Sequence, residues 1–127
     1  MSQRIFLVED EPTIVDIYKT ALEAEGFKVE SFKLGEAAFE KLKEYKEKEY
    51  PDLILLDLVL PDINGIEVLK KIRGEKRLKE IPVFILTNYT SEELKKQGHD
   101  LKAEQYITKA DFTPKEIVKK VKERLKG

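Results

Sequence analysis

Short apolar segments alternate along the whole chain with segments of helical periodicity. Five apolar runs predict β-strands, at residues 5–8, 29–32, 53–56, 83–86 and 106–107. The third and fourth runs, Leu-Ile-Leu-Leu and Val-Phe-Ile-Leu, have no polar position. Such runs are typical of strands that are buried on both faces of a parallel sheet.

Apolar residues recur every three or four positions between these runs and predict helices at 14–22, 38–45, 66–72 and 117–125. The segment 91–98 has Leu94 as its only large apolar residue, so we expect a loosely held helix there. Asn64, Thr90 and Thr113 are each followed three residues later by glutamate, which predicts a capping box at three helix starts.

Strands that alternate with helices predict an α/β fold, a doubly wound (βα)5 sheet with helices on both faces. The chain has 127 residues, which suits one domain over residues 1–127.

Composition removes several classes of function. The 24 basic and 25 acidic residues nearly cancel, so we expect no direct binding of nucleic acid. The absence of cysteine excludes disulfides, zinc–thiolate sites and thiol catalysis. No apolar run approaches the roughly 18 residues of a membrane span, and the N-terminus does not resemble a signal peptide. We therefore expect a cytoplasmic protein without membrane insertion.

Polar side chains lie at or just past the ends of four of the predicted strands. They are Glu9, Asp10 and Glu11 after the first strand, Asp57 after the third, Thr87 after the fourth and Lys109 after the fifth. The carboxyl ends of parallel strands meet at one edge of the sheet, where ligands bind. Clustered carboxylates favour a hard cation such as Mg²⁺, and a hydroxyl with an ammonium suits phosphoryl oxygens.

Each of these residues also has an ordinary structural explanation when it is taken alone. The acids after the first strand suit a solvated turn before a helix, Asp57 suits a strand-end cap, and Lys109 suits the surface. The joint pattern favours a functional site. His99, the single histidine, is expected at the surface near a helix end and is given no role.

Four segments carry a resemblance to a known family. They are Ile-Phe-Leu-Val-Glu-Asp-Glu at 5–11, Leu-Ile-Leu-Leu-Asp-Leu-Val-Leu-Pro-Asp-Ile-Asn-Gly at 53–65, Ile-Pro-Val-Phe-Ile-Leu-Thr at 81–87 and Tyr-Ile-Thr-Lys at 106–109. In this order and spacing they resemble the receiver domains of response regulators in two-component signalling, and in particular single-domain, chemotaxis-regulator-like receivers. The resemblance implies a flavodoxin-like three-layer sandwich with strand order 2-1-3-4-5.

The resemblance also implies roles for individual residues. Asp57 would be the phosphoacceptor, a carboxylate nucleophile. Asp10 and Asp57 would bind Mg²⁺ directly, together with the backbone carbonyl of Val59, and Glu9 would act largely through a bound water. Two further roles concern the phosphorylated state: Thr87 and Lys109 would bind phosphoryl oxygens, and Tyr106 would be the switch aromatic that follows Thr87.

The partners that the resemblance implies are a sensor histidine kinase or a histidine phosphotransfer protein as donor. The 127 residues contain no effector domain, so we expect either a stand-alone protein with a separate output protein as target or an excised domain of a longer chain. We also expect a monomer or a weak phosphorylation-dependent dimer, with slow self-dephosphorylation and no turnover as an enzyme.

Three departures from the family pattern lie beside the site. Asn88 stands where a small residue is usual, Ala110 where proline is usual, and Lys-Ala at 102–103 where Gly-Ala is common. Val59 and Tyr89 would flank the path of the hydrolytic water, with Asn88 adding bulk. Because neither can act as a general base, these positions predict slow loss of the phosphoryl group.

Three alternatives differ in class. A receiver fold that works as a phosphate-independent interaction module is the first, although the complete set of site residues disfavours it. An aspartate-nucleophile phosphohydrolase of the haloacid dehalogenase type would need an acid two residues after its nucleophile, where this chain has Val59. A flavodoxin would meet repulsion between its phosphate and the acidic loop after the first strand.

Overall fold

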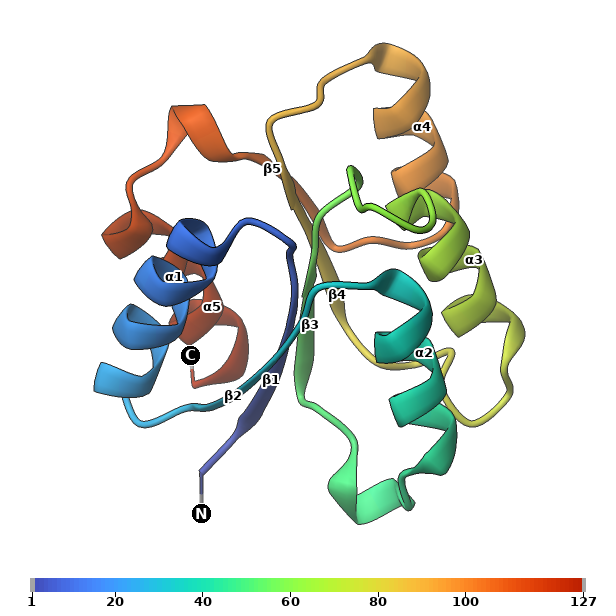
Figure 1. The fold of residues 1–127 in the computed structure, drawn as a ribbon, viewed down its shortest axis with the longest axis horizontal. Helices are drawn as coiled ribbons and strands as arrows, with labels where there is room; N and C mark the ends of the chain where they lie inside the picture. The colour runs from blue at the N-terminus through green and yellow to red at the C-terminus, as the bar shows by residue number, and fades with distance from the viewer. Residues whose placement is uncertain (1, 127) are drawn as a thin grey trace.

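Five parallel strands form the centre of the molecule, in the order β2-β1-β3-β4-β5 (Figure 1). The computed structural model describes residues 2–126. The strands are β1 (Arg4–Val8), β2 (Lys28–Phe32), β3 (Leu53–Leu56), β4 (Val83–Thr87) and β5 (Gln105–Thr108). The helices are α1 (Pro12–Ala24), α2 (Gly35–Glu44), α3 (Gly65–Gly74), α4 (Glu92–Asp100) and α5 (Pro114–Leu125). Two single turns of 3₁₀ helix, η1 (Glu47–Glu49) and η2 (Lys109–Asp111), complete the chain order. The predicted α/β fold and strand order are confirmed.

The sheet is covered on both faces, which gives three layers. Helices α1 and α5 lie against one face and α2, α3 and α4 against the other (Figure 1). Successive strand residues serve opposite layers: Leu53 and Leu55 pack towards α1 and α5, whereas Ile54 and Leu56 pack towards α2 and α3. The absence of a polar position in β3 therefore follows from burial on both sides.

The helix starts follow the predicted capping pattern only in part. The predicted capping box at Thr113 is present, with Glu116 reaching back to the backbone of Thr113. Asn64 caps α3 by accepting from the Ile66 N–H at 2.8 Å. The expected cap at Thr90 is wrong: Ser91 takes this position at α4, accepting from the Leu94 N–H at 3.0 Å.

Two contacts hold the loop between β3 and α3 close to the strand end. The Gly65 N–H donates to the Leu58 carbonyl at 2.9 Å, and any Cβ at Gly65 would overlap the backbone of Asp57 and Leu58. Farther along the loop, the Asp62 carboxylate accepts from the N–H groups of Gly35 and Glu36, both at 3.0 Å. These contacts fix the segment that follows Asp57 between two helix starts.

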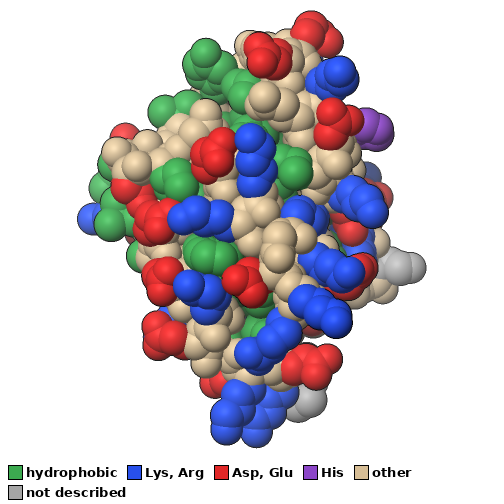
Figure 2. All heavy atoms as spheres, turned by 90° about the vertical axis from the view of Figure 1, so that its right-hand side faces the viewer, with side chains coloured by type: hydrophobic (Ala, Val, Ile, Leu, Met, Phe, Trp, Pro, Cys, Tyr) green, Lys and Arg blue, Asp and Glu red, His purple; other side chains and the backbone are tan. Residues whose placement is uncertain are grey.

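Charged side chains of both signs are interspersed on the side of the molecule that lies to the right in Figure 1 (Figure 2). Lys71 of α3 pairs with Glu36 of α2 at 2.6 Å, and Lys70 pairs with Glu67 at 3.2 Å. Exposed pairs of this kind each contribute little to stability. Among residues 2–126, no helix combines the length and apolar character that crossing a bilayer requires.

The Arg73 guanidinium ties the end of α3 to two other segments. It donates to the carbonyls of Leu101 and Lys102 after α4, at 2.8 and 3.2 Å, and to those of Lys79 and Ile81 before β4, at 3.0 and 2.9 Å. Burial lowers the pKa of Arg73 from its usual value. The C-terminal end of α4 is therefore anchored by one side chain, which complements the sparse apolar face of this helix.

We predict that Arg73→Ala lowers the free energy of unfolding by about 2–3 kcal/mol, because four carbonyls lose a charged donor in a partly buried site. Arg77→Ala is the matched control, since Arg77 is exposed and, among residues 2–126, its hydrogen bond goes to the Tyr45 carbonyl alone, at 3.2 Å, beside a looser contact with the Tyr50 ring. Urea titrations of both variants measure the difference. Equal losses in the two would contradict the anchoring role of Arg73.

Candidate functional site

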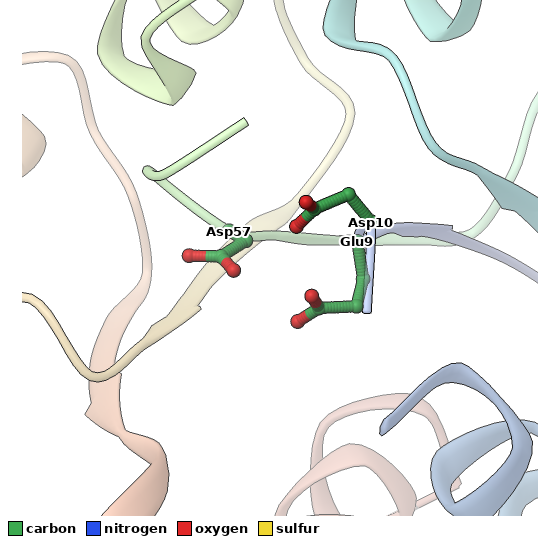
Figure 3. Close-up of side chains that lie close together, drawn as sticks. All are labelled: Glu9, Asp10 and Asp57. Atoms are coloured by element: carbon green, nitrogen blue, oxygen red, sulfur yellow. The ribbon is translucent and has the colours of Figure 1, made fainter. Parts of the chain in front are cut away.

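Three carboxylates meet at the carboxyl ends of β1 and β3, which are neighbours in the sheet. Glu9 and Asp10 follow β1, and Asp57 follows β3. One oxygen from each lies within 4.8 Å of the others. Figure 3 shows the three side chains extending to the same side of the strand ends. The structure thus brings together three of the predicted metal-site residues, as expected from parallel strands in this order.

Lys109 reaches this cluster from the end of β5. Its ammonium donates to Asp57 Oδ2 at 3.0 Å and to Glu9 Oε1. The other oxygens of these two acids accept from backbone groups, Asp57 Oδ1 from the Val59 N–H at 3.1 Å and Glu9 Oε2 from the Glu11 N–H at 3.0 Å. Each buried carboxylate is therefore fixed at both oxygens.

Burial decides the electrostatics of the site. Glu9 and Asp57 are only 3% and 6% exposed, so both are largely removed from water. Burial raises the pKa of Glu9, while the hydrogen bond from Lys109 opposes the rise. Burial alone would lower the pKa of Lys109, but its pairing with Glu9 and Asp57 raises it overall. Lys109 therefore stays charged, and three carboxylates against one ammonium leave an excess of negative charge.

A cleft of about 430 Å³ opens above these groups. It is lined by Glu9, Asp10, Glu11, Ile14, Asp57, Val59, Thr87, Asn88, Tyr89 and Lys109. The lining includes every predicted site residue except Tyr106. Sequence reasoning missed Ile14, which was predicted only as part of the helical stripe of α1. Its position in the first turn of α1, just after the acids, was the available signal.

Thr87 and Tyr106 both contact the backbone of Tyr89. Thr87 is buried, and its Oγ1 accepts from the Tyr89 N–H at 3.2 Å. The Tyr106 hydroxyl donates to the Tyr89 carbonyl, from outside the cleft. Tyr89 thus connects the hydroxyl at the end of β4 with the aromatic residue on β5.

The acid cluster fits a hard divalent cation. Oxygen ligands with an uncompensated negative charge are what Mg²⁺ and similar ions require. Glu9, Asp10 and Asp57 provide that donor set among the described residues. The open cleft leaves room for waters, which Mg²⁺ retains when few protein ligands are present.

Comparison with known proteins gives the family. Residues 5–122 match the response regulator receiver domain. The chain belongs to this family. It is 40% identical over 126 residues to the regulatory protein VanRc of Enterococcus gallinarum, covering 99% of this chain and 51% of VanRc. The chain spans about half the length of the curated relatives it matches.

Solved receiver structures share the fold. The structure of the phosphorylated cyanobacterial phytochrome response regulator RcpA aligns with 97% of this chain and 93% of the RcpA chain, with 33% identity and a TM-score of 0.85. The Mn²⁺-bound form of the response regulator Rcp1 covers 95% and 92% of the two chains, with 30% identity and a TM-score of 0.84. The protein is therefore a receiver of two-component signalling, with an acidic pocket typical of phosphoaspartate acceptors.

We predict that Asp10→Asn weakens Mg²⁺ binding by roughly tenfold or more, because the cluster loses one of its few anionic ligands. A Mg²⁺ titration followed by NMR should shift resonances of Asp10, Asp57 and Val59 in the unmodified protein. Glu11→Gln is the matched control, since Glu11 lies next to Asp10 but outside the close cluster. Equal Mg²⁺ affinity of Asp10→Asn and the unmodified protein would refute the metal assignment.

Proposed function

We propose that Asp57 accepts a phosphoryl group from the phosphohistidine of a sensor histidine kinase or a histidine phosphotransfer protein. The observation that carries this proposal is the Asp57 carboxylate, held at 3.0 Å from the Lys109 ammonium beside two further acids in an open cleft. The phosphorylated state of RcpA and the metal-bound state of Rcp1 support it by likeness. A cytoplasmic location stays a prediction.

The reaction is an in-line transfer. An oxygen of Asp57 forms a bond to phosphorus while the phosphorus–nitrogen bond of the donor breaks, and the imidazole keeps that electron pair and takes up a proton. Charge neutralisation and positioning supply most of the catalysis in such transfers. Asp10, Asp57, Glu9 and the Val59 carbonyl would hold Mg²⁺, which supplies the neutralisation when bound. Lys109 binds a phosphoryl oxygen after transfer, and the Thr87 hydroxyl donates to another.

Phosphorylation then changes the surface near α4. The new charge of about −1.5 to −2 draws the Thr87 hydroxyl inward. Because Thr87 and Tyr106 both hold Tyr89, this movement changes the position of Tyr106 and of the loop before α4. Leu94 is the only large apolar anchor of this helix, and its C-terminal end is tied by Arg73, so the N-terminal end moves most readily. An output protein, or an output domain if the chain is part of a longer protein, reads the new surface, and we expect the phosphorylated chain to be a monomer or a weak dimer.

The Tyr106 switch predicts different ring environments with and without beryllofluoride, a mimic of the phosphoryl group. NMR of labelled tyrosine should show a changed Tyr106 rotamer, together with faster or slower amide exchange at the N-terminal end of α4. Tyr50, which lies at the end of η1, serves as the internal control. An unchanged Tyr106 ring in the saturated complex would contradict the switch.

The central test of the function is covalent labelling. Acetyl phosphate with Mg²⁺ should add one acid-stable, base-labile phosphoryl group to Asp57, located by mass spectrometry. Asp57→Asn should abolish the label, whereas Asp52→Asn, at an acid before β3, should retain it. A label on any other residue would refute the phosphoacceptor, and complete absence of a label would favour a phosphate-independent interaction module.

We predict slow self-dephosphorylation. Val59 and Tyr89 are 56% and 55% exposed at the mouth of the cleft, and neither side chain has a carboxylate or amide that could hold the attacking water. Val59→Asn combined with Tyr89→Glu should accelerate decay by about 10²-fold, the contribution of a positioned polar group. Val59→Leu with Tyr89→Phe is the control, which changes both side chains without adding a carboxylate or amide. A decay time course after removal of the phosphodonor measures the rates, and equal rates in the two variants would show that these positions do not govern hydrolysis.

A further inference from the structure

A side chain joins the two loops that carry Thr87 and Lys109. The pairing of β4 with β5 ends at Thr87 and Thr108. Beyond this pair, one chain continues into the loop before α4 and the other into η2. Here the Ala110 N–H donates to Asn88 Oδ1 at 2.8 Å. This hydrogen bond connects the two segments beyond the last residue pair of β4 and β5.

The connection lies directly beside both phosphoryl-binding candidates. Asn88 follows Thr87, and Ala110 follows Lys109. Consecutive Cα atoms are only about 3.8 Å apart. A hydrogen bond between Asn88 and Ala110 therefore also limits the distance between the backbones of Thr87 and Lys109. Two further hydrogen bonds hold the loop after Thr87. The Tyr106 hydroxyl donates to the Tyr89 carbonyl, and the Tyr89 N–H donates to Thr87 Oγ1.

The bond depends on the identity of both residues. A proline at position 110 would have no N–H to donate, and an alanine or glycine at position 88 would have no acceptor. Asn88 and Ala110 are two of the three departures from the family pattern beside the site. In the structure the two departures meet in one hydrogen bond.

We propose that Asn88 is a positioning residue that sets the distance between Thr87 and Lys109 for phosphoryl binding; this inference rests on the function proposed above. The Thr87 hydroxyl and the Lys109 ammonium must reach oxygens of the same phosphoryl group. A spacing fixed before binding lowers the cost of ordering both loops when the group arrives. The hydrogen bond of the Asn88 side chain goes to the Ala110 backbone and to none of the acids among the described residues.

A double-mutant cycle tests the inference, with the beryllofluoride affinity measured by NMR titration at saturating Mg²⁺. Asn88→Ala removes the acceptor and Ala110→Pro removes the donor. Each variant should bind beryllofluoride about three- to tenfold more weakly, the loss of one hydrogen bond, and the double variant should bind no more weakly than either single one. Mg²⁺ affinity without beryllofluoride should stay the same, because the three carboxylates are untouched. A general loss of structure would instead weaken the binding of both Mg²⁺ and beryllofluoride.

Thr90→Ala is the matched control in the same loop, since no hydrogen bond of the Thr90 side chain is found among the described residues. This variant should bind beryllofluoride as tightly as the unmodified protein. If Ala110→Pro does not fold, Asn88→Ala decides alone, and the temperature coefficient of the Ala110 amide proton should increase in magnitude in that variant. If the losses of beryllofluoride affinity in the two single variants add up in the double variant, or if Asn88→Ala keeps full affinity, the positioning role of Asn88 is refuted. The proposed function is not affected by either result. Failure of the unmodified protein to bind beryllofluoride would overturn the proposed function and this inference with it.

Discussion

The site depends on one interaction, the pairing of the Lys109 ammonium with two buried carboxylates. Glu9 and Asp57 lie at the ends of neighbouring strands, where their charges repel each other and have lost most of their hydration. Lys109 comes from β5, which is separated from β3 by β4 in the sheet. Its long side chain therefore passes the end of β4, where Thr87 lies, so that Thr87 and Lys109 line the same cleft as Asp57. A buried acid pair without that cation would be costly to fold.

The surrounding loops hold this arrangement by contacts between side chains and backbone. Asp62 fixes the loop after Asp57 by capping α2, and Gly65 allows that loop to turn back onto the strand end. On the other side of the cleft, Asn88 and Tyr106 fix the loop after Thr87. Side-chain contacts to the backbone therefore hold the loops on both sides of the cleft, the one after Asp57 and the one after Thr87.

The strands and the acids could be predicted from the sequence because both follow from local patterns and one topological rule. Uninterrupted apolar runs marked β3 and β4, and the meeting of parallel strand ends placed Asp57 with Asp10 and Lys109. The Arg73 anchor and the Asp62 cap could not be predicted. Their longest connections join residues 26–29 positions apart through backbone carbonyls and amides, which leave no pattern in the sequence. The cap of α4 was misplaced by one residue, because Thr90 and Ser91 are both good caps and only the backbone conformation distinguishes them.

Fluorine NMR of the protein with beryllofluoride tests the central claim most directly, because this mimic reports a phosphoryl site built on an aspartate without requiring a donor protein. We expect one set of bound ¹⁹F resonances per chain, which requires Mg²⁺ and disappears in Asp57→Asn. Bound resonances that persist in Asp57→Asn, or none in the unmodified protein at excess Mg²⁺ and beryllofluoride, would contradict it.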